Sequence, residues 1–304
     1  MIKRTIYIGN PSHISVKNKQ LIIERKSDLE EQNVKNQIAV EDIGVIMLDN
    51  QQITISQRTL QLLLENNAII LICGQNHMPQ GLLFPIEGNT IQSERYRYQI
   101  EASVPLKKQL WQQTVSMKIR NQASLLEFYD IKTENMQRWA SEVTSGDGRN
   151  HEARAAAYYW GNLFDDCFKR GRFGEPPNNY LNYGYAVLRA VIARSLVGSG
   201  LMLTLGLHHS NRYNAFCLAD DVMEPYRPFV DQLVIKTLND LEEDSGELTP
   251  EVKKKLLVIP AMDVYIDGMR SPLMIAAQRT SASLAKCIAG ENRKIIYPEL
   301  NNDK

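Results

Sequence analysis

Two short polar segments in the C-terminal half of the chain could carry chemistry. Residues 207–214 contain the neighbouring histidines His208 and His209, and residues 220–228 contain the acids Asp220, Asp221 and Glu224. Residues three or four apart share one face of a helix, so Glu224 can approach either aspartate. Carboxylates held close together require a proton or a cation between them, and the neighbouring imidazoles favour a cation. Mixed oxygen and nitrogen ligands suit Mn²⁺ or Mg²⁺, which keep open positions for phosphate oxygens.

The same residues also fit ordinary structural roles. Asp220 and Asp221 are typical of a helix N-terminus, and Glu224 can form a solvated pair with Arg227. The histidines fit satisfied polar positions, and Glu152, at the start of an alanine-rich run, fits a first-turn acid that complements the helix dipole. No single residue decides between a structural role and a metal site.

Several common catalytic templates are absent from the sequence. No GxxxxGK[ST] loop exists, so ATP hydrolysis by a P-loop is unsupported. Gly198-Ser199-Gly200 lacks the third glycine of a dinucleotide fingerprint, and His151-Glu152 lacks the second histidine of HExxH because position 155 is alanine. A GxSxG elbow is also missing. These absences leave the polar segments as the main candidate for chemistry.

Composition indicates an ordinary globular protein and does not by itself suggest DNA. The 304 residues are 43% hydrophobic and 23% charged, with 35 basic and 35 acidic side chains. Any DNA-binding surface must therefore arise from local clustering of charge. The scattered cysteines, without CxxC spacing, predict buried reduced thiols in a cytosolic protein; they are Cys73, Cys167, Cys217 and Cys287. With no signal-peptide pattern and no apolar run of membrane-spanning length, we expect a soluble, cytoplasmic protein.

The elements predict an α+β protein, with a small β-rich N-terminal domain followed by a larger all-α C-terminal domain. Alternating or continuous apolar runs predict strands at 5–8, 13–16, 20–23, 43–48, 52–55, 68–73 and 82–84, with a helix at 57–66. From about residue 94 the spacing becomes helical, which predicts helices at 105–128, 133–143, about 150–160, 181–207 and from 220 onward. We expect domains at 1–92 and 100–304, joined by a linker at 93–99.

Four basic residues fall on the helix expected at 105–128. They are Lys107, Lys108, Lys118 and Arg120, and we assign them to faces other than the apolar one. They fit either a solvated surface or a sequence-independent track for a DNA backbone.

Taken together, five segments resemble the CRISPR-associated spacer-acquisition integrase/endonuclease family ("Cas-one") in its type II form. The resemblance spans nearly the whole chain. The segments are Trp111 with Lys118-Ile119-x-Asn121-Gln122; Glu152 with Tyr159-Trp160; 181–188, LNYGYAVL; 205–209, LGLHH; and 218–228, LADDVMEPYRP. The last two, at this separation, are the most specific.

The resemblance implies a metal site and a set of DNA contacts. The metal-binding and catalytic residues would be Glu152, His209 and Glu224, because the family spacing back from Glu224 selects His209 over His208. Asp221 would be a supporting acid near the metal. The implied nucleic-acid contacts are Arg212, Arg227, Lys118, Arg154 and Asn182, although Arg227 and Arg212 fit intramolecular pairing with Glu224 or Asp220 equally well. One departure affects these contacts: Ala157 stands where the family commonly has an arginine, and Arg154 lies one turn earlier.

The family's reaction joins a DNA fragment (protospacer) into a repeat array. A free 3′-hydroxyl attacks a phosphodiester and displaces another 3′-hydroxyl, so no triphosphate is consumed. The cofactor would be Mg²⁺ or Mn²⁺, and because His209 ligates only when neutral, activity should fall as pH drops.

The implied partners are DNA, a second copy bound through the β-rich domain, and the small dimeric protein "Cas-two". A type II effector nuclease and a ring-shaped accessory protein are further candidates. Two other functions remain open: a metal-dependent nuclease that does not join DNA, and a non-catalytic DNA-binding scaffold.

Overall fold

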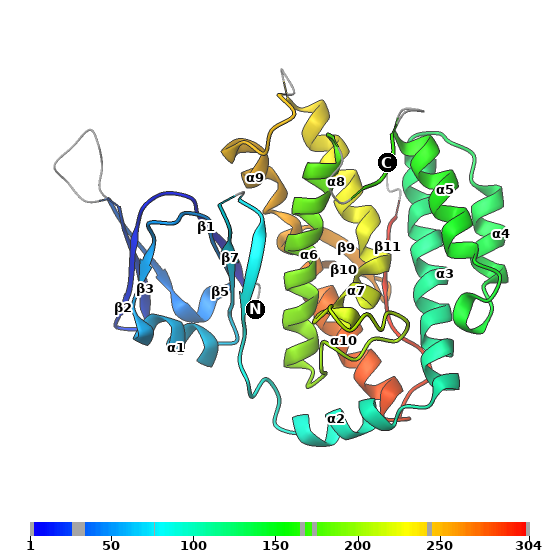
Figure 1. The fold of residues 1–304 in the computed structure, drawn as a ribbon, viewed down its shortest axis with the longest axis horizontal. Helices are drawn as coiled ribbons and strands as arrows, with labels where there is room; N and C mark the ends of the chain where they lie inside the picture. The colour runs from blue at the N-terminus through cyan, green and yellow to red at the C-terminus, as the bar shows by residue number, and fades with distance from the viewer. Residues whose placement is uncertain are drawn as a thin grey trace.

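The chain forms a β-rich part and a helical part that lie side by side (Figure 1). The computed structural model describes residues 3–25, 34–75, 77–164, 168–171, 175–241 and 245–301. Cys73, Cys217 and Cys287 are buried free thiols, as expected, and Cys167 lies outside the described residues. None of the described helices is long and apolar enough to cross a membrane.

The β-rich part contains two four-stranded sheets and one helix, α1 (Gln57–Glu65). The first sheet has the order β1-β5-β7-β8, with β1, β5 and β7 parallel and β8 antiparallel to β7. The second has the order β4-β3-β2-β6. The strands are β1 (Arg4–Ile8), β2 (His13–Lys17), β3 (Gln20–Arg25), β4 (Val34–Ala39), β5 (Ile43–Leu48), β6 (Thr54–Ile55), β7 (Ile69–Cys73) and β8 (Pro79–Leu83).

The strands predicted at 13–16 and 20–23 are confirmed, and as β2 and β3 they form an antiparallel hairpin. Lys17 pairs with Gln20, and the two turn residues Asn18 and Lys19 have φ values of 51° and 59°. Two left-handed residues in a two-residue loop match the twist of the flanking strands. Strand β4, by contrast, was not predicted, because a run of three polar residues at 35–37 interrupts the usual strand alternation; it lies at the sheet edge, where such composition is tolerated.

The first sheet is buried on both faces and so joins two hydrophobic cores. Val45 and Met47 of β5 belong to the core of the helical part, whereas Ile46 belongs to the core with the second sheet and α1. Burial on both faces explains why β5 and β7 are continuous apolar runs. The two parts therefore share packing across this sheet.

A buried cluster of charges also ties the two parts together. Asp49, which follows β5, accepts a hydrogen bond from Tyr7 Oη at 2.6 Å and pairs with Lys253 Nζ at 2.9 Å. His77 Nδ1 lies 2.9 Å from the other Asp49 oxygen. Lys253 belongs to α9 (Pro250–Leu256), and its side chain is 3% exposed while that of Asp49 is 1% exposed.

The helical part is built around α3 and α6, which carry 11 and 15 of its buried residues. Besides α9, the bounds are α2 (Gln92–Glu101), α3 (Val104–Phe128), α4 (Glu134–Glu142), α5 (His151–Leu163), α6 (Asn178–Gly198), α7 (Cys217–Met223), α8 (Arg227–Asn239) and α10 (Leu273–Ile288). The 3₁₀ turns are η1 (Val40–Asp42), η2 (Ser145–Asp147), η3 (Glu224–Tyr226) and η4 (Ile259–Ala261). The residues expected to form a linker, 93–99, lie inside α2.

One predicted helix is too long. The apolar stretch 181–207 was expected to be helical throughout, but α6 ends at Gly198. Gly200 has φ 71°, its N–H donates to Val197, and the Leu201 N–H donates to Leu196. This pattern is a Schellman C-cap, in which a left-handed glycine terminates a helix. Residues 201–216 therefore lie outside the helix and form the loop that carries both histidines.

The expectation of an all-α C-terminal part is wrong. A three-stranded sheet of order β10-β9-β11 lies within it, formed by β9 (Asp263–Ile266), β10 (Met269–Pro272) and β11 (Pro298–Glu299). Asp267 and Gly268, with φ 54° and 72°, form the two-residue turn between β9 and β10. An Asp-Gly turn beside an alternating strand is a hairpin signal, so the sequence did contain this information.

Candidate active site

Helix α3 places a lysine between two carboxylates. Lys118 Nζ lies 2.7 Å from Glu152 Oε1 and 2.6 Å from Glu224 Oε2, and the Lys118 side chain is 11% exposed. Trp111, Val115 and Lys118 recur at helical spacing on the buried face of α3. The expectation that Lys118 lies, with Lys107, Lys108 and Arg120, on a face other than the apolar one is therefore wrong, because Lys118 falls on the buried stripe.

Glu152 is held at the first turn of α5. The Asp147 carboxylate accepts the backbone N–H groups of His151 and Glu152, each at 2.9 Å, and so caps the helix start. Further along α5, Tyr159 Oη donates to Asp231 Oδ2 on α8 at 2.7 Å. Sequence analysis did not assign Asp147 a role, although an aspartate just before an alanine-rich helix is a recognisable cap signal.

Glu224 begins η3, at the junction between α7 and α8. Asn121 on α3 donates to the Pro225 carbonyl at 2.7 Å and to the Pro298 carbonyl at 3.0 Å, which fixes this junction beside Lys118. Arg227 Nε lies 2.8 Å from Glu224 Oε1, and its guanidinium stacks over Tyr185 at 4.6 Å. Arg227 is thus engaged inside the protein.

Opposite charges keep this centre ionised despite its burial. Burial alone would raise the pKa of Glu224, but Arg227 and Lys118 outweigh it and lower that pKa to about 2. Burial would likewise lower the pKa of Lys118, but the charges of Glu224 and Glu152 outweigh it and raise that pKa. The Glu224 carboxylate and the Lys118 ammonium therefore remain charged together.

The histidine loop is organised by Asp221. Its fully buried carboxylate accepts the backbone N–H groups of Leu207 at 2.6 Å, His208 at 2.9 Å and His209 at 3.3 Å, and it also hydrogen-bonds His209 Nδ1. The hydrogen bond from Asp221 raises the pKa of His209 against the opposing effect of burial, and the charges of Glu224 and Glu152 add to this rise. The imidazole of His209 therefore lies within the field of the same two acids.

The two neighbouring histidines have different surroundings. The His208 ring stacks on Trp111, with ring centroids 4.5 Å apart and planes 4° from parallel. His209 is the residue whose Nδ1 is held by Asp221 and whose ring meets Trp111 edge-on at 5.8 Å. An imidazole held through one nitrogen by a carboxylate presents the other nitrogen in a defined orientation.

Gly206 allows the loop to close on Asp221. A Cβ at this position would lie 2.3 Å from the His209 carbonyl oxygen and 2.7 Å from Asp221 Oδ2. Those distances are too short for any side chain, so the glycine is required by packing. Sequence analysis included Gly206 only as part of a family segment and assigned it no role.

The remaining predicted residues are not gathered around the acids. Asp220 pairs with Arg189 at 2.6 Å, and Asn182 accepts a hydrogen bond from Arg170 at 2.7 Å. Arg212 is exposed and lies over the Tyr213 ring at 4.7 Å, and Arg154 is exposed over Trp139 at 5.6 Å.

The side chains of Glu152, Glu224 and His209 are of the chemical types that bind divalent cations. Within the described residues, no group of three or more His, Cys, Asp and Glu side chains is already arranged around a metal position. However, the Lys118 ammonium shows that Glu152 and Glu224 share one cation, and His209 is hydrogen-bonded to Asp221, three residues before Glu224. Two carboxylates and an imidazole are suitable ligands for Mg²⁺ or Mn²⁺.

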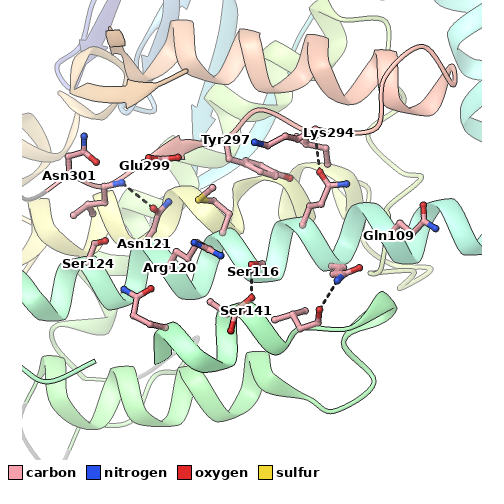
Figure 2. A pocket seen from close by; sticks show the side chains of 18 of the residues that line it. Gln109, Ser116, Arg120, Asn121, Ser124, Ser141, Lys294, Tyr297, Glu299 and Asn301 are labelled. Carbon is pink, nitrogen blue, oxygen red and sulfur yellow. Dashed lines mark hydrogen bonds between the residues drawn. The ribbon is translucent and has the colours of Figure 1, made fainter. Parts of the chain in front are cut away.

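A separate cavity of about 910 Å³ lies on the opposite face of α3 (Figure 2). Gln109, Ser116, Arg120 and Ser124 follow α3 along this cavity, whose other walls come from α4 and the chain after α10. Its lining includes none of Glu152, His209 and Glu224. The candidate active site and this cavity are therefore distinct.

The chain belongs to the Cas1 family: the family model described as CRISPR associated protein Cas1 matches residues 6–266.

Curated relatives agree with this assignment. The chain is 35% identical to a CRISPR-associated endonuclease Cas1 from Neisseria meningitidis serogroup C (strain 8013), over 99% of this chain and 97% of the relative. It is 27% identical to a CRISPR-associated endonuclease Cas1 from Pyrobaculum aerophilum, over 84% of this chain and 90% of that relative.

Solved structures share the fold. A casposase bound to integration product matches with a TM-score of 0.83 at 19% identity, over 100% of this chain and 96% of that chain. A Cas1 protein from Thermotoga maritima matches with a TM-score of 0.72 at 17% identity, over 95% of this chain and 98% of that one.

Proposed function

We propose that this Cas1-family enzyme is a divalent-cation-dependent integrase of CRISPR adaptation, which joins a DNA fragment into a repeat array. The observation that carries the proposal is the convergence of Glu152 from α5 and Glu224 from η3 on one shared cation, the Lys118 ammonium, with His209 hydrogen-bonded to Asp221, three residues before Glu224. Carboxylates from distant segments that share a cation are suited to a metal site for phosphate chemistry.

The proposed ligands are Glu152, His209 and Glu224, and the neighbouring residues position them. Arg227 engages Glu224 Oε1, which leaves Oε2 as the oxygen directed to the shared cation. Asp221 engages His209 Nδ1, which leaves Nε2 for ligation. We therefore assign Asp221 a positioning role rather than a place among the ligands.

The reaction exchanges one phosphodiester for another. The 3′-hydroxyl of the fragment loses its proton and bonds to the target phosphorus, while the target's own P–O3′ bond breaks and its oxygen takes up a proton. A bound Mg²⁺ or Mn²⁺ would polarise the phosphoryl oxygen and stabilise the developing oxyanions. The bonds formed and broken are equivalent, in keeping with the missing P-loop.

DNA and a Cas2 protein are the partners we propose. The similar structures include a casposase bound to integration product and a Cas6-RT-Cas1–Cas2 complex. Arg212 and Arg154 are the better candidates for phosphate contacts, because both are exposed. Lys118, Arg227 and Asn182 are engaged inside the protein.

The domain roles are also part of this proposal. We assign residues 1–92 to a β-rich dimerisation domain and 100–304 to the catalytic domain that follows it. A type II effector nuclease and a ring-shaped accessory protein remain candidates for the larger assembly.

A joining assay tests the proposed function. A labelled fragment is incubated with a repeat-containing target and Mn²⁺, in parallel with EDTA, and joined products are separated from cleaved ones. We expect joining only with the metal, and Glu152→Gln is expected to abolish it because the amide cannot replace the carboxylate. Joining in EDTA would rule out the metal requirement, and metal-dependent cleavage without joined product would favour a nuclease.

Gly206→Ala is expected to lower the initial joining rate about 10–100-fold, the usual cost of disturbing residues that orient a metal ligand. The added methyl group would collide with the His209 carbonyl and the Asp221 carboxylate. Gly198→Ala is the matched control, because a Cβ there meets nothing within 4 Å. Equal joining rates in the two variants would contradict the role given to Gly206.

A further inference from the structure

Lys118 occupies the space that the proposed metal needs. Its Nζ is within 2.7 Å of one oxygen from each carboxylate, Glu152 Oε1 and Glu224 Oε2. A metal ion that bound both oxygens would lie about 2.1 Å from each, between them. An ammonium and a divalent cation cannot share that space, because they would overlap and repel each other.

The surrounding residues hold Lys118 in this position between the two carboxylates. Lys118 lies on the buried stripe of α3, three residues before Asn121, which anchors the junction carrying Glu224. Arg227 already engages the other oxygen of Glu224, so the ammonium is the cation that links this acid to Glu152. Without a cation at this point, two partly buried carboxylates would repel each other.

We propose that Lys118 is an intramolecular counter-cation that holds Glu152 and Glu224 together before metal binding and is expelled when the divalent cation enters. The inference rests on the proposed metal site. Lys118 is thus a positioning residue that competes with the metal, and its presence weakens metal affinity while stabilising the metal-free fold.

Removal of the Lys118 charge should lower the stability of the metal-free fold and raise the affinity for the metal. In Lys118→Met, we expect the Tm in EDTA to fall by about 5 °C or more, because the acids lose their counter-ion. We expect the dissociation constant for Mn²⁺ to fall by about tenfold or more, because the competing charge is gone. The Tm rise on adding Mn²⁺ should therefore exceed that of the unsubstituted protein.

Calorimetric titration with Mn²⁺ and thermal unfolding with and without EDTA measure both properties. Lys118→Arg retains the charge and is expected to leave Mn²⁺ affinity weak. Lys253→Met is the control for a generally destabilised protein, because Lys253 is a buried lysine paired with Asp49 in a different cluster. It should lower the Tm without tightening Mn²⁺ binding.

The outcomes separate this inference from the proposed function. If the unsubstituted protein binds Mn²⁺ and Lys118→Met binds it equally or more weakly, only the counter-cation role is overturned. If the unsubstituted protein binds no Mn²⁺, both fail. If Lys118→Met does not fold, a crystal structure of the unsubstituted protein with Mn²⁺ decides: Lys118 Nζ should have left at least one carboxylate, and its retention between both would overturn the inference.

Discussion

Replacing His209 by phenylalanine is expected to reduce DNA joining about a thousandfold. The change removes the imidazole proposed as a metal ligand, which Asp221 holds through Nδ1. Loss of a metal ligand removes several kcal/mol of charge stabilisation in the transition state, and each 1.36 kcal/mol corresponds to a tenfold change in rate. Single-turnover joining rates with saturating DNA and Mn²⁺ measure the effect.

The neighbouring histidine provides a matched control. His208 stacks on Trp111 with nearly parallel rings, and phenylalanine retains an aromatic ring that can stack there. His208→Phe is therefore expected to keep most of the joining rate. A larger loss in His208→Phe than in His209→Phe would contradict the assignment of His209 and favour its neighbour.

Lys253→Met is expected to lower the free energy of unfolding by about 3–5 kcal/mol, the usual cost of breaking a buried ion pair from one side. Asp49 would remain buried without its charged lysine partner, in contact with Tyr7 and His77. The pair bridges β5 and α9, so the loss should loosen the β-rich part from the helical part. Chemical denaturation followed by circular dichroism provides the measurement.

Two comparisons define how this stability result is interpreted. Lys254→Met changes an exposed neighbour in α9 and is expected to alter stability by no more than about 0.5 kcal/mol. The double variant Asp49→Asn with Lys253→Met removes both charges and should recover much of the loss. A loss in Lys253→Met no larger than that in Lys254→Met would show that the buried pair contributes little.

Features that depend on local sequence were predicted well. The helix expected at 105–128 is α3 (Val104–Phe128), which begins at the Ser103 cap with proline in its first turn. The hairpin around Asn18 follows from its turn residues, and the apolar run at 68–73 follows from double-sided burial of β7. In each case the signal lies within one element, where spacing and turn chemistry decide the conformation.

Features that depend on contacts between distant segments were missed or misassigned. Lys118 was placed with surface lysines, because its sequence neighbours do not reveal that Glu152 and Glu224 approach it from two other segments. Asp221 stays a predicted supporting acid, but the sequence did not indicate that its buried carboxylate accepts the backbone N–H groups of the histidine loop. The loop itself was taken for helix, because its apolar residues obscured the glycine that ends α6.

By itself, the sequence determined the family, the order of strands and helices through much of the chain, and the residue types available for phosphate chemistry, since these depend on motifs and on local spacing. Only the tertiary structure showed that Lys118 lies between two acids and that Asp221 holds His209. The physical reason is that the partner of a buried charge is brought to it by the packing of other elements of the fold. The residues next to that charge in the sequence do not show which opposite charge will contact it.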